Sequence, residues 1–233
     1  MRYGREQKLA TRQRIVESAG RRFKRDGIDG SGVSTLMQDA GLTNGAFYTH
    51  FTSKDDLVAA AVADQLHSQN ANIVAQAAPG RAGLAQIVQW YLSAEHRDSP
   101  VNGCPSAALL DEIGRCSELT KQSYTDGVLL VIDGIAARLA PDDPASVRTK
   151  ALCAYAMMAG TLQLSRALAD GRLSDAVLEQ GIRNALALLG IDTQSVGDLE
   201  PTNHQAQAPA GLSEPRRQAD PTTITTSTAN LKQ

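Results

Sequence analysis

The fold is decided by residues 34–51, which read STLMQDAGLTNGAFYTHF. The apolar residues from Leu36 to Ala40 fall at helical spacing, Ser34 or Thr35 is the expected cap of this short helix, and the glycine that follows ends it. A second short helix begins after this turn, capped by Thr43 or Asn44. Two short helices joined by a tight turn form a helix-turn-helix, whose second helix presents small and polar side chains to the major groove of DNA.

Helical periodicity continues on both sides of this segment. Apolar residues from Ile15 to Phe23 recur at helical spacing, with Arg and Lys on the other face, and Gly27 ends that helix. Ser53 caps a further helix, whose acidic first turn suits the helix dipole. Because strand-like alternation is hard to find, we expect an all-α fold with a three-helix, helix-turn-helix headpiece at its N-terminus.

Longer and more apolar helices follow from about residue 78. We expect them at about 106–117, 118–140, 144–170 and 174–190, after a helix around Leu84 to Leu92 and a loop at 98–105. Ser174 is the expected cap of the last helix. From about residue 192 the chain has almost no large apolar side chains, which predicts a disordered tail. The predicted domains are 1–52 (DNA-binding), 53–191 (ligand binding and dimerisation) and 192–233 (tail).

Composition excludes several classes of protein. No apolar run approaches the ~18 residues that cross a bilayer, and the first residues lack the apolar core of a signal peptide. The three cysteines are too few for a disulfide framework and do not have zinc-site spacing, so we expect a cytoplasmic protein without a metal or cofactor. Residues 1–57 hold 10 Lys and Arg against 7 Asp and Glu, whereas the remainder holds 13 against 18. This charge asymmetry favours a polyanionic partner at the N-terminal end.

The motifs RFKRDGIDG (22–30), LMQDAGLTNGAFYTHF (36–51) and SKDDL (53–57) resemble the TetR/AcrR family of bacterial transcriptional regulators. The resemblance runs from about Thr11 to Leu57, and Met37 stands where many members have alanine. It implies a DNA-binding headpiece and a larger helical domain that binds a ligand and forms dimers.

The resemblance implies nine DNA-contacting positions. Thr43, Asn44, Gly45 and Phe47 are expected at the groove-facing start of the recognition helix, and Ser34, Thr35, Tyr48, His50 and Lys54 are expected at phosphates. Alternative roles remain open: Phe47 as core, Tyr48 and His50 as packing residues, and Lys54 as a solvated lysine. Arg2, Arg5, Lys8 and Arg12 are candidates for a flexible basic arm, with a solvated face as the alternative.

The resemblance also implies roles for the larger domain. Helices 144–170 and 174–190 are expected to form a homodimer, through the small residues Ala154, Ala156, Ala159, Gly160, Ala185 and Ala187 and the apolar residues Leu162, Ile182, Leu186 and Leu189. The candidate ligand-binding residues are Trp90, Tyr91, Cys104, Tyr124, Tyr155 and Met158, which suit a mainly apolar small-molecule effector. The alternative for both groups is the core of a single chain.

Cys104 is a candidate sensor because it stands at a loop-to-helix junction, where the helix dipole stabilises a thiolate. Cys116 is a candidate resolving partner, and Cys153 is expected to be structural. The alternative for Cys104 is a small buried apolar residue.

We therefore predict a sequence-specific DNA-binding regulator, acting as a repressor that leaves a palindromic operator on ligand binding or cysteine modification. His96, Cys104 and the pair Asp111-Glu112 show no nucleophile–base arrangement, so we expect no enzyme. A helical dimeric protein-interaction module without specific DNA readout is the alternative.

Overall fold

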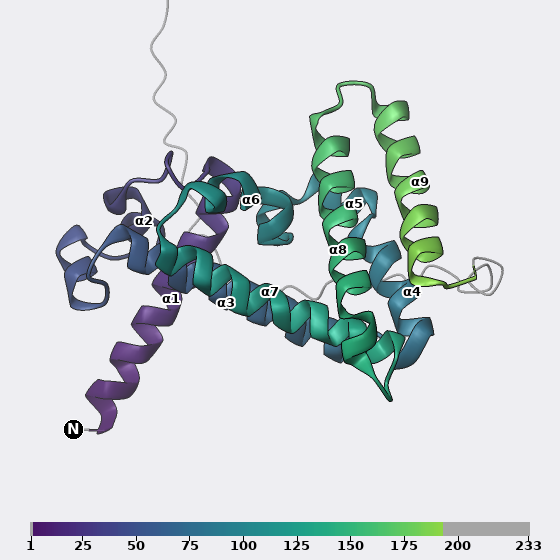
Figure 1. Cartoon of the computed structure of the whole chain (residues 1–233). Helices are drawn as coiled ribbons and strands as arrows, with labels where there is room; N and C mark the ends of the chain where they lie inside the picture. The colour runs from purple at the N-terminus through teal and green to yellow at the C-terminus, as the bar shows by residue number, and fades with distance from the viewer. Residues whose placement is uncertain (1, 193–233) are drawn as a thin grey trace, which may run out of the picture. The chain divides into compact units, whose positions relative to one another are not determined.

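The computed structural model describes residues 2–192, and the expected tail lies outside these residues except for Asp192. Every regular element in the described part is helical, which confirms the all-α prediction (Figure 1). The elements are α1 (Arg2–Asp26), α2 (Val33–Asp39), the 3-10 helix η1 (Asn44–Thr49), α3 (Lys54–Gln76), α4 (Gly80–Tyr91), α5 (Ala94–Asp98), the 3-10 helix η2 (Pro100–Asn102), α6 (Pro105–Arg115), α7 (Glu118–Leu139), α8 (Pro144–Ala167) and α9 (Gly171–Leu189). Between residues 2 and 192, no helix has both the length and the apolar character needed to span a membrane.

The headpiece is formed by α1, α2, η1 and the start of α3. Gly27 and Gly41 follow α1 and α2 with φ of +80° and +68°, a left-handed conformation that glycine adopts without steric cost. Ser53 caps α3 as predicted, with its side chain accepting from the N–H of Asp56. The predicted caps of α2 are wrong, because Gly32 holds the N-cap position and Ser34 and Thr35 lie inside the first turn.

Two further local predictions differ from the structure. The segment expected as a loop at 98–105 contains the end of α5 and all of η2. The cap of α9 is Asp170, whose carboxylate accepts from the N–H groups of Arg172 and Leu173, whereas Ser174 is buried within the helix. A carboxylate at this position satisfies two backbone donors and is stabilised by the positive end of the helix dipole.

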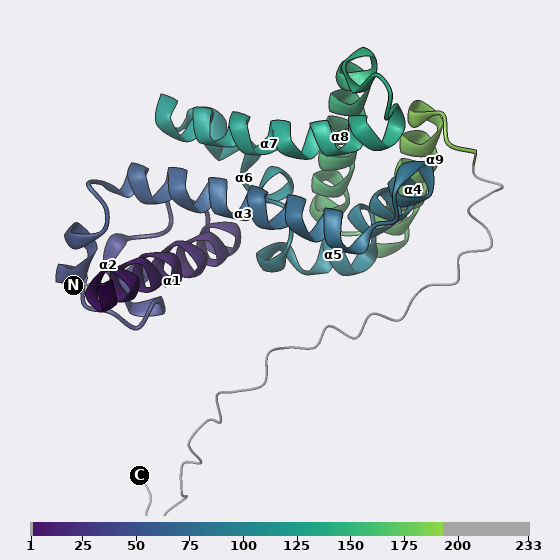
Figure 2. The ribbon, with the colours of Figure 1, turned by 90° about the horizontal axis from the view of Figure 1, so that it is seen from below.

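Residues 2–192 contain two apolar cores. The first is built by the headpiece helices with Leu109 and Ile113 of α6, and Met37 fills space in it with no exposed surface. The second is built by α4, α7, α8 and α9. Helix α3 contributes to both, with Leu57 to Leu66 in the first core and Ile73 in the second. It runs alongside α7 (Figures 1 and 2), so one continuous helix joins the headpiece to the larger body.

Helices α8 and α9 pack against each other. Many of the side chains expected at a dimer contact are used in this packing and are buried within the chain: Ala154, Ala159, Leu162, Ala185, Leu186 and Leu189. These residues belong to the core of the chain rather than to its surface. Ala156, Gly160 and Ala187 are exposed, together with Leu152 and Leu164 of α8 and Leu173 of α9.

Candidate DNA-binding headpiece and sensor site

The start of η1 is open to solvent. Thr43, Asn44 and Gly45 are exposed, and a Cβ added to Gly45 would meet no atom within 4 Å. Thr43 has an extended backbone, with φ of −79° and ψ of 154°, which turns the chain into the 3-10 helix. Tyr48 is 74% exposed and places its ring edge-on against Phe47. These four residues therefore form one exposed polar surface at the predicted recognition position.

Phe47 is a core residue rather than a DNA contact. Its side chain is only 1% exposed. Its ring stacks on that of Phe51, with centroids 5.7 Å apart. The period of a short helix places Phe47 on the inner side, which leaves the outer side to its neighbours Tyr48 and Asn44.

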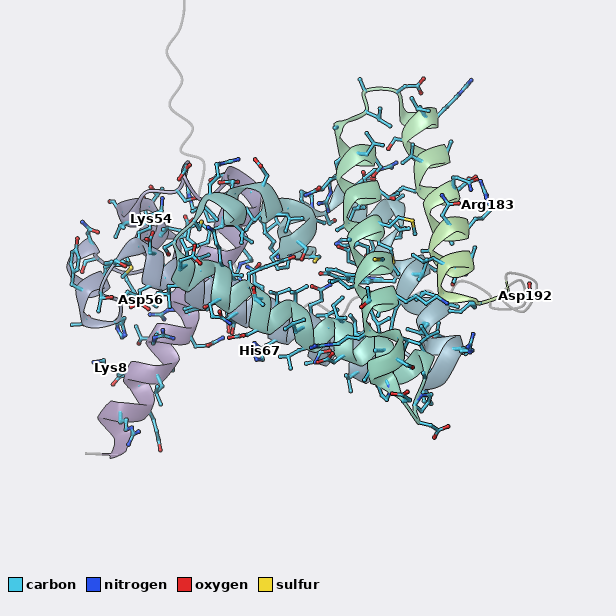
Figure 3. The ribbon with its side chains drawn as sticks, viewed as in Figure 1. Lys8, Lys54, Asp56, His67, Arg183 and Asp192 are labelled. Atoms are coloured by element: carbon cyan, nitrogen blue, oxygen red, sulfur yellow. The ribbon has the colours of Figure 1, made fainter. Side chains whose placement is uncertain are left out.

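The other residues predicted to contact phosphates differ in their exposure to solvent. Ser34 is exposed and Thr35 is half-buried in the first turn of α2. His50 is half-buried, and burial together with the positive charges of Lys8 and Arg12 lowers its pKa. Lys54 donates from Nζ to the carbonyl of Ile28 at 2.6 Å, so its ammonium group supports the α1–α2 loop (Figure 3).

A chain of polar side chains is buried around Cys104, which is 1% exposed. Cys104 Sγ lies 3.0 Å from the hydroxyl of Tyr155, which lies 2.9 Å from Ser106 Oγ. Ser106 Oγ lies 2.9 Å from the hydroxyl of Tyr124. The ring of Tyr91 packs edge-on against that of Tyr155. Burial raises the pKa of Tyr91 and Tyr155 well above the usual range, so both remain neutral.

Four predicted ligand-binding residues thus meet in one place, and Met158 lies in the same apolar core. Trp90 does not join them, because it is 47% exposed and stacks on the ring of His96 at 4.9 Å. The hydroxyl of Tyr91 is buried without a hydrogen-bond partner. Pockets of about 210 and 230 Å³ open elsewhere, one beside Arg166 and the other beside Lys54. The polar side chains around Cys104 hydrogen-bond to one another.

His96 holds the turn that carries Cys104, a role that the sequence did not indicate. Its Nδ1 donates to the carbonyl of Tyr91 at 2.8 Å, which leaves Nε2 to accept from the N–H of Cys104 at 3.1 Å. Burial, followed by the charges of Arg166 and Lys24, lowers the pKa of His96 to about 4. The ring is therefore neutral at pH 7 in the folded protein.

This pKa predicts acid sensitivity. An unfolded histidine titrates near 6.5 and the folded one near 4, so the unfolded state binds more protons between these values. The contribution of neutral His96 to the free energy of unfolding is fully present above about pH 6.5. It decreases as the pH falls, by about 2 kcal/mol between pH 7 and pH 5. Urea unfolding at both pH values measures this loss. His96→Gln should make the pH dependence shallower and His67→Gln, at an exposed site, should not. An unchanged dependence in His96→Gln would contradict the assignment.

The three cysteines differ in exposure. Cys104 is buried, Cys116 is intermediate and Cys153 is exposed, so the expectation of a structural Cys153 is wrong. Cys104 and Cys116 flank the 11 residues of α6, which span about 16 Å. A disulfide needs Cα atoms within about 7 Å, so the folded chain does not allow this pair to form one. Burial and the carboxylates of Asp55, Asp29 and Glu112 also raise the pKa of the Cys116 thiol.

Thiol labelling tests the burial of Cys104. We expect a maleimide to modify Cys104 at least about tenfold more slowly in the folded protein than in urea, because Cys104 must wait for local opening. Peptide mass spectrometry of the labelled protein gives the rate at each site, with labelling in urea as the control for intrinsic reactivity. Mild oxidation should give no intramolecular Cys104–Cys116 peptide pair. Such a pair from folded protein would contradict the placement of these thiols at opposite ends of α6.

Polar contacts join the Cys104 turn to the headpiece. Lys24 of α1 donates from Nζ to the carbonyl of Gly103 at 2.8 Å, and burial lowers its pKa to about 8. Glu112 of α6 accepts from the backbone N–H of Ile28 at 2.7 Å. The end of α1 and the turn after it are therefore bonded to Gly103, just before α6, and to Glu112, near the end of α6. The sequence offered no signal for these contacts, since charged residues of α1 also occur on solvated faces.

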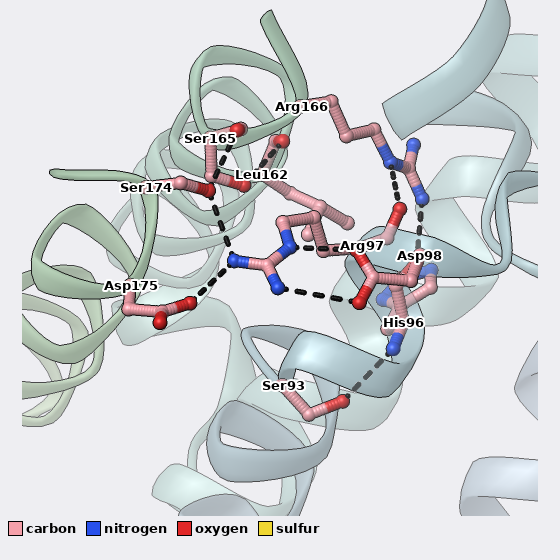
Figure 4. Close-up of polar contacts among 9 residues, drawn as sticks. All are labelled: Ser93, His96, Arg97, Asp98, Leu162, Ser165, Arg166, Ser174 and Asp175. Carbon is pink, nitrogen blue, oxygen red and sulfur yellow. Dashed lines mark hydrogen bonds and ion pairs between the residues drawn. The ribbon is translucent and has the colours of Figure 1, made fainter. Parts of the chain in front are cut away.

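Arg166 of α8 holds the same region from the other side (Figure 4). Its guanidinium donates to three backbone carbonyls, those of His96 at 2.7 Å, Ala107 at 2.9 Å and Arg97 at 3.0 Å. Two of these carbonyls end α5, which is where a cation is favoured by the helix dipole. Arg166 thereby fixes α5 and the start of α6 on the two sides of Cys104.

Comparison with known proteins agrees with this arrangement. A family model described as "Bacterial regulatory proteins, tetR family" matches residues 15–61. The HTH-type transcriptional regulator TtgR of Pseudomonas putida is 39% identical over 62 residues, which are 27% of this chain and 29% of that protein. The chain thus matches under a third of the length of this curated relative.

Solved structures share the fold over most of the chain. A TetR-family regulator from Cytophaga hutchinsonii has a TM-score of 0.64 at 22% identity, over 80% of this chain and 96% of that chain. The reduced form of NemR from E. coli has a TM-score of 0.63 at 19% identity, over 76% of this chain and 95% of that chain.

An N-terminal helix-turn-helix headpiece joined by one long helix to a larger helical body defines a class of bacterial regulatory proteins. Residues 15–61 match the tetR family model, and the chain shares its fold with solved TetR-family regulators.

Proposed function

We infer that the chain is a sequence-specific DNA-binding transcriptional regulator, working in the cytoplasm as a repressor. The observation that carries this inference is the exposed start of η1, where Thr43, Asn44 and Gly45 form a small polar surface over a buried core. Such side chains enter the major groove without steric conflict and hydrogen-bond to base edges. Tyr48 and Ser34, both exposed, are suited to phosphates on either side.

The proposed assembly is a homodimer through α8 and α9. Leu152, Ala156, Gly160 and Leu164 are exposed at intervals of four residues, which places them along one side of α8. A second copy of the chain would cover this apolar side by a two-fold arrangement. The two headpieces would then read the two halves of a palindromic operator about one helical turn apart.

The proposed sensor is the buried polar chain at Cys104. A small-molecule effector that enters there, or a modification of the thiol, has to displace Tyr155 or Tyr124, because their hydroxyls occupy the space. This rearrangement would reach the headpiece through the bond between Lys24 and Gly103. Release of DNA then follows if the effector binds the displaced arrangement more tightly than the DNA-bound one.

Selection of binding sites from a random duplex pool tests this function. With reduced protein near physiological salt, we expect enrichment of a palindrome whose half-sites lie about one turn apart. The selected duplex then serves to measure release by candidate effectors, with Cys104→Ser separating thiol modification from ligand binding. The absence of enrichment, with only weak non-specific binding, would instead favour the protein-interaction module.

Tyr48→Phe isolates one phosphate contact. Loss of one hydroxyl donor should weaken binding about fivefold on every duplex, which is the effect of roughly 1 kcal/mol. The melting temperature should not change, because the side chain is exposed. Lys54→Ala is a less selective test, since it also removes the bond to Ile28 and lowers stability. Unchanged affinity in Tyr48→Phe would show that the hydroxyl does not contact phosphate.

A further inference from the structure

Helix α1 begins well before the family match. It starts at Arg2, whereas the matched domain starts at residue 15. All side chains from Gly4 to Ala10 are exposed. In Figure 1 these turns run past the other helices of the headpiece, and Figure 3 marks Lys8 on them. The segment expected as a flexible basic arm is therefore a helical extension of α1.

One face of α1 changes character along its length. The side that packs into the headpiece is apolar and buried at Val16, Ala19 and Phe23. Arg12 lies four residues before Val16 and seven before Ala19, so it is on the same side of the helix as they are. Arg5 lies seven residues before Arg12 and is on this side too. Lys8 lies four residues before Arg12 on the same side. The face that is apolar within the headpiece is thus continued by cations beyond it.

This cationic face, Arg5, Lys8 and Arg12, is continuous with the proposed DNA-binding surface. The guanidinium of Arg12 lies 4.7 Å from the ring centre of Phe51, directly after the recognition element. The charges of Lys8 and Arg12 both act on His50, whose pKa they lower. Glu6, the acidic residue of these turns, is about 100° away from Arg5 around the helix. The arrangement concentrates positive charge beside the end of η1.

We propose that the cationic face of the α1 extension, through Arg5 and Lys8, contacts the phosphates of duplex DNA outside the half-site that η1 reads. The proposal rests on the proposed function and extends its interface. From Arg12 to Arg5 the helix rises about 10 Å, which corresponds to about three base pairs of flanking duplex. Phosphate contacts do not depend on sequence, so this extension adds affinity and orientation without changing the operator that is recognised.

The test compares two duplexes that carry the selected operator, one trimmed to the half-sites and one with additional base pairs on both sides. We expect the unmodified protein to bind the longer duplex about tenfold more tightly. Arg5→Gln combined with Lys8→Gln should remove most of this advantage and leave affinity for the trimmed duplex unchanged. The slope of log affinity against log salt should decrease by about two for each bound chain.

Arg14→Gln combined with Arg21→Gln is the matched control. Both residues are exposed and lie on the side of α1 opposite Arg5 and Lys8. This variant therefore loses the same two positive charges from a face that is not proposed to contact DNA. Circular dichroism checks that both variants keep their helices. The proposal is overturned if the Arg5/Lys8 variant behaves like this control, or if it loses the same affinity on both duplexes. Failure of the unmodified protein to prefer any sequence would instead contradict the proposed function itself.

Discussion

Phe47→Ala should abolish DNA binding by unfolding the headpiece. Phe47 is buried between the rings of Phe51 and Tyr48 and has no polar contact that a smaller residue could keep. Truncation of a buried phenylalanine costs about 3–5 kcal/mol, because apolar area is lost and a cavity remains. The headpiece is small and its recognition element is a short 3-10 helix, so this loss is a large part of its stability. Thermal unfolding and binding to the selected duplex measure the two effects.

Tyr48→Ala is the control for this prediction, because Tyr48 is adjacent but exposed. It should reduce DNA affinity while the unfolding midpoint stays close to that of the unmodified protein. Phe47→Ala should reduce both, and its far-UV signal should lose part of the helix content. If Phe47→Ala bound DNA weakly with unchanged thermal stability, Phe47 would be a DNA contact after all and its burial would be wrong.

Arg166→Met should destabilise the larger body and expose Cys104. The guanidinium donates to the partly buried carbonyls of His96, Arg97 and Ala107, which lose this donor in the variant. Loss of a hydrogen bond from a charged donor costs about 1–3 kcal/mol, and packing of the methionine side chain offsets part of the total, so we expect a loss of about 3 kcal/mol. Because these carbonyls flank the Cys104 turn, maleimide labelling of Cys104 should accelerate along with the decrease in stability.

Arg172→Met provides the comparison, since Arg172 is exposed on α9. It removes the same charge and should change the free energy of unfolding by less than about 0.5 kcal/mol. Faster Cys104 labelling in Arg166→Met without a change in global stability would indicate local opening of the turn alone. Unchanged labelling and stability together would show that Arg166 does not hold α5 and α6.

Local signals predicted the helices well. Gly27 and Gly41 end α1 and α2 where expected, and α7 runs from Glu118 to Leu139 against an expected 118–140. These features depend on a few neighbouring residues and on the helical period, both of which are visible in one sequence. The caps were less predictable, because several hydroxyl residues stand near each helix start. Gly32 and Asp170 hold positions assigned to Ser34 or Thr35 and to Ser174.

Periodicity also identifies apolar faces without saying what covers them. In α8 and α9, Leu162 and Leu186 are buried within the chain, whereas Leu152 and Leu164 are left exposed. Cys153 stands in an apolar stretch and is nevertheless exposed. A helix with apolar residues on more than one side can bury either side, and only its neighbours decide which one it buries.

The sequence by itself determined the all-α fold, the helix-turn-helix and the small polar residues that begin the recognition element, because these depend on short motifs. Tertiary structure alone decided the contacts between distant residues. Lys24 and Gly103 are separated by 79 positions, and Cys104 and Tyr155 by 51. It also placed Lys54 on the Ile28 carbonyl and Phe47 in the core. Such pairs depend on how whole helices pack, and no pattern within a single helix contains that information.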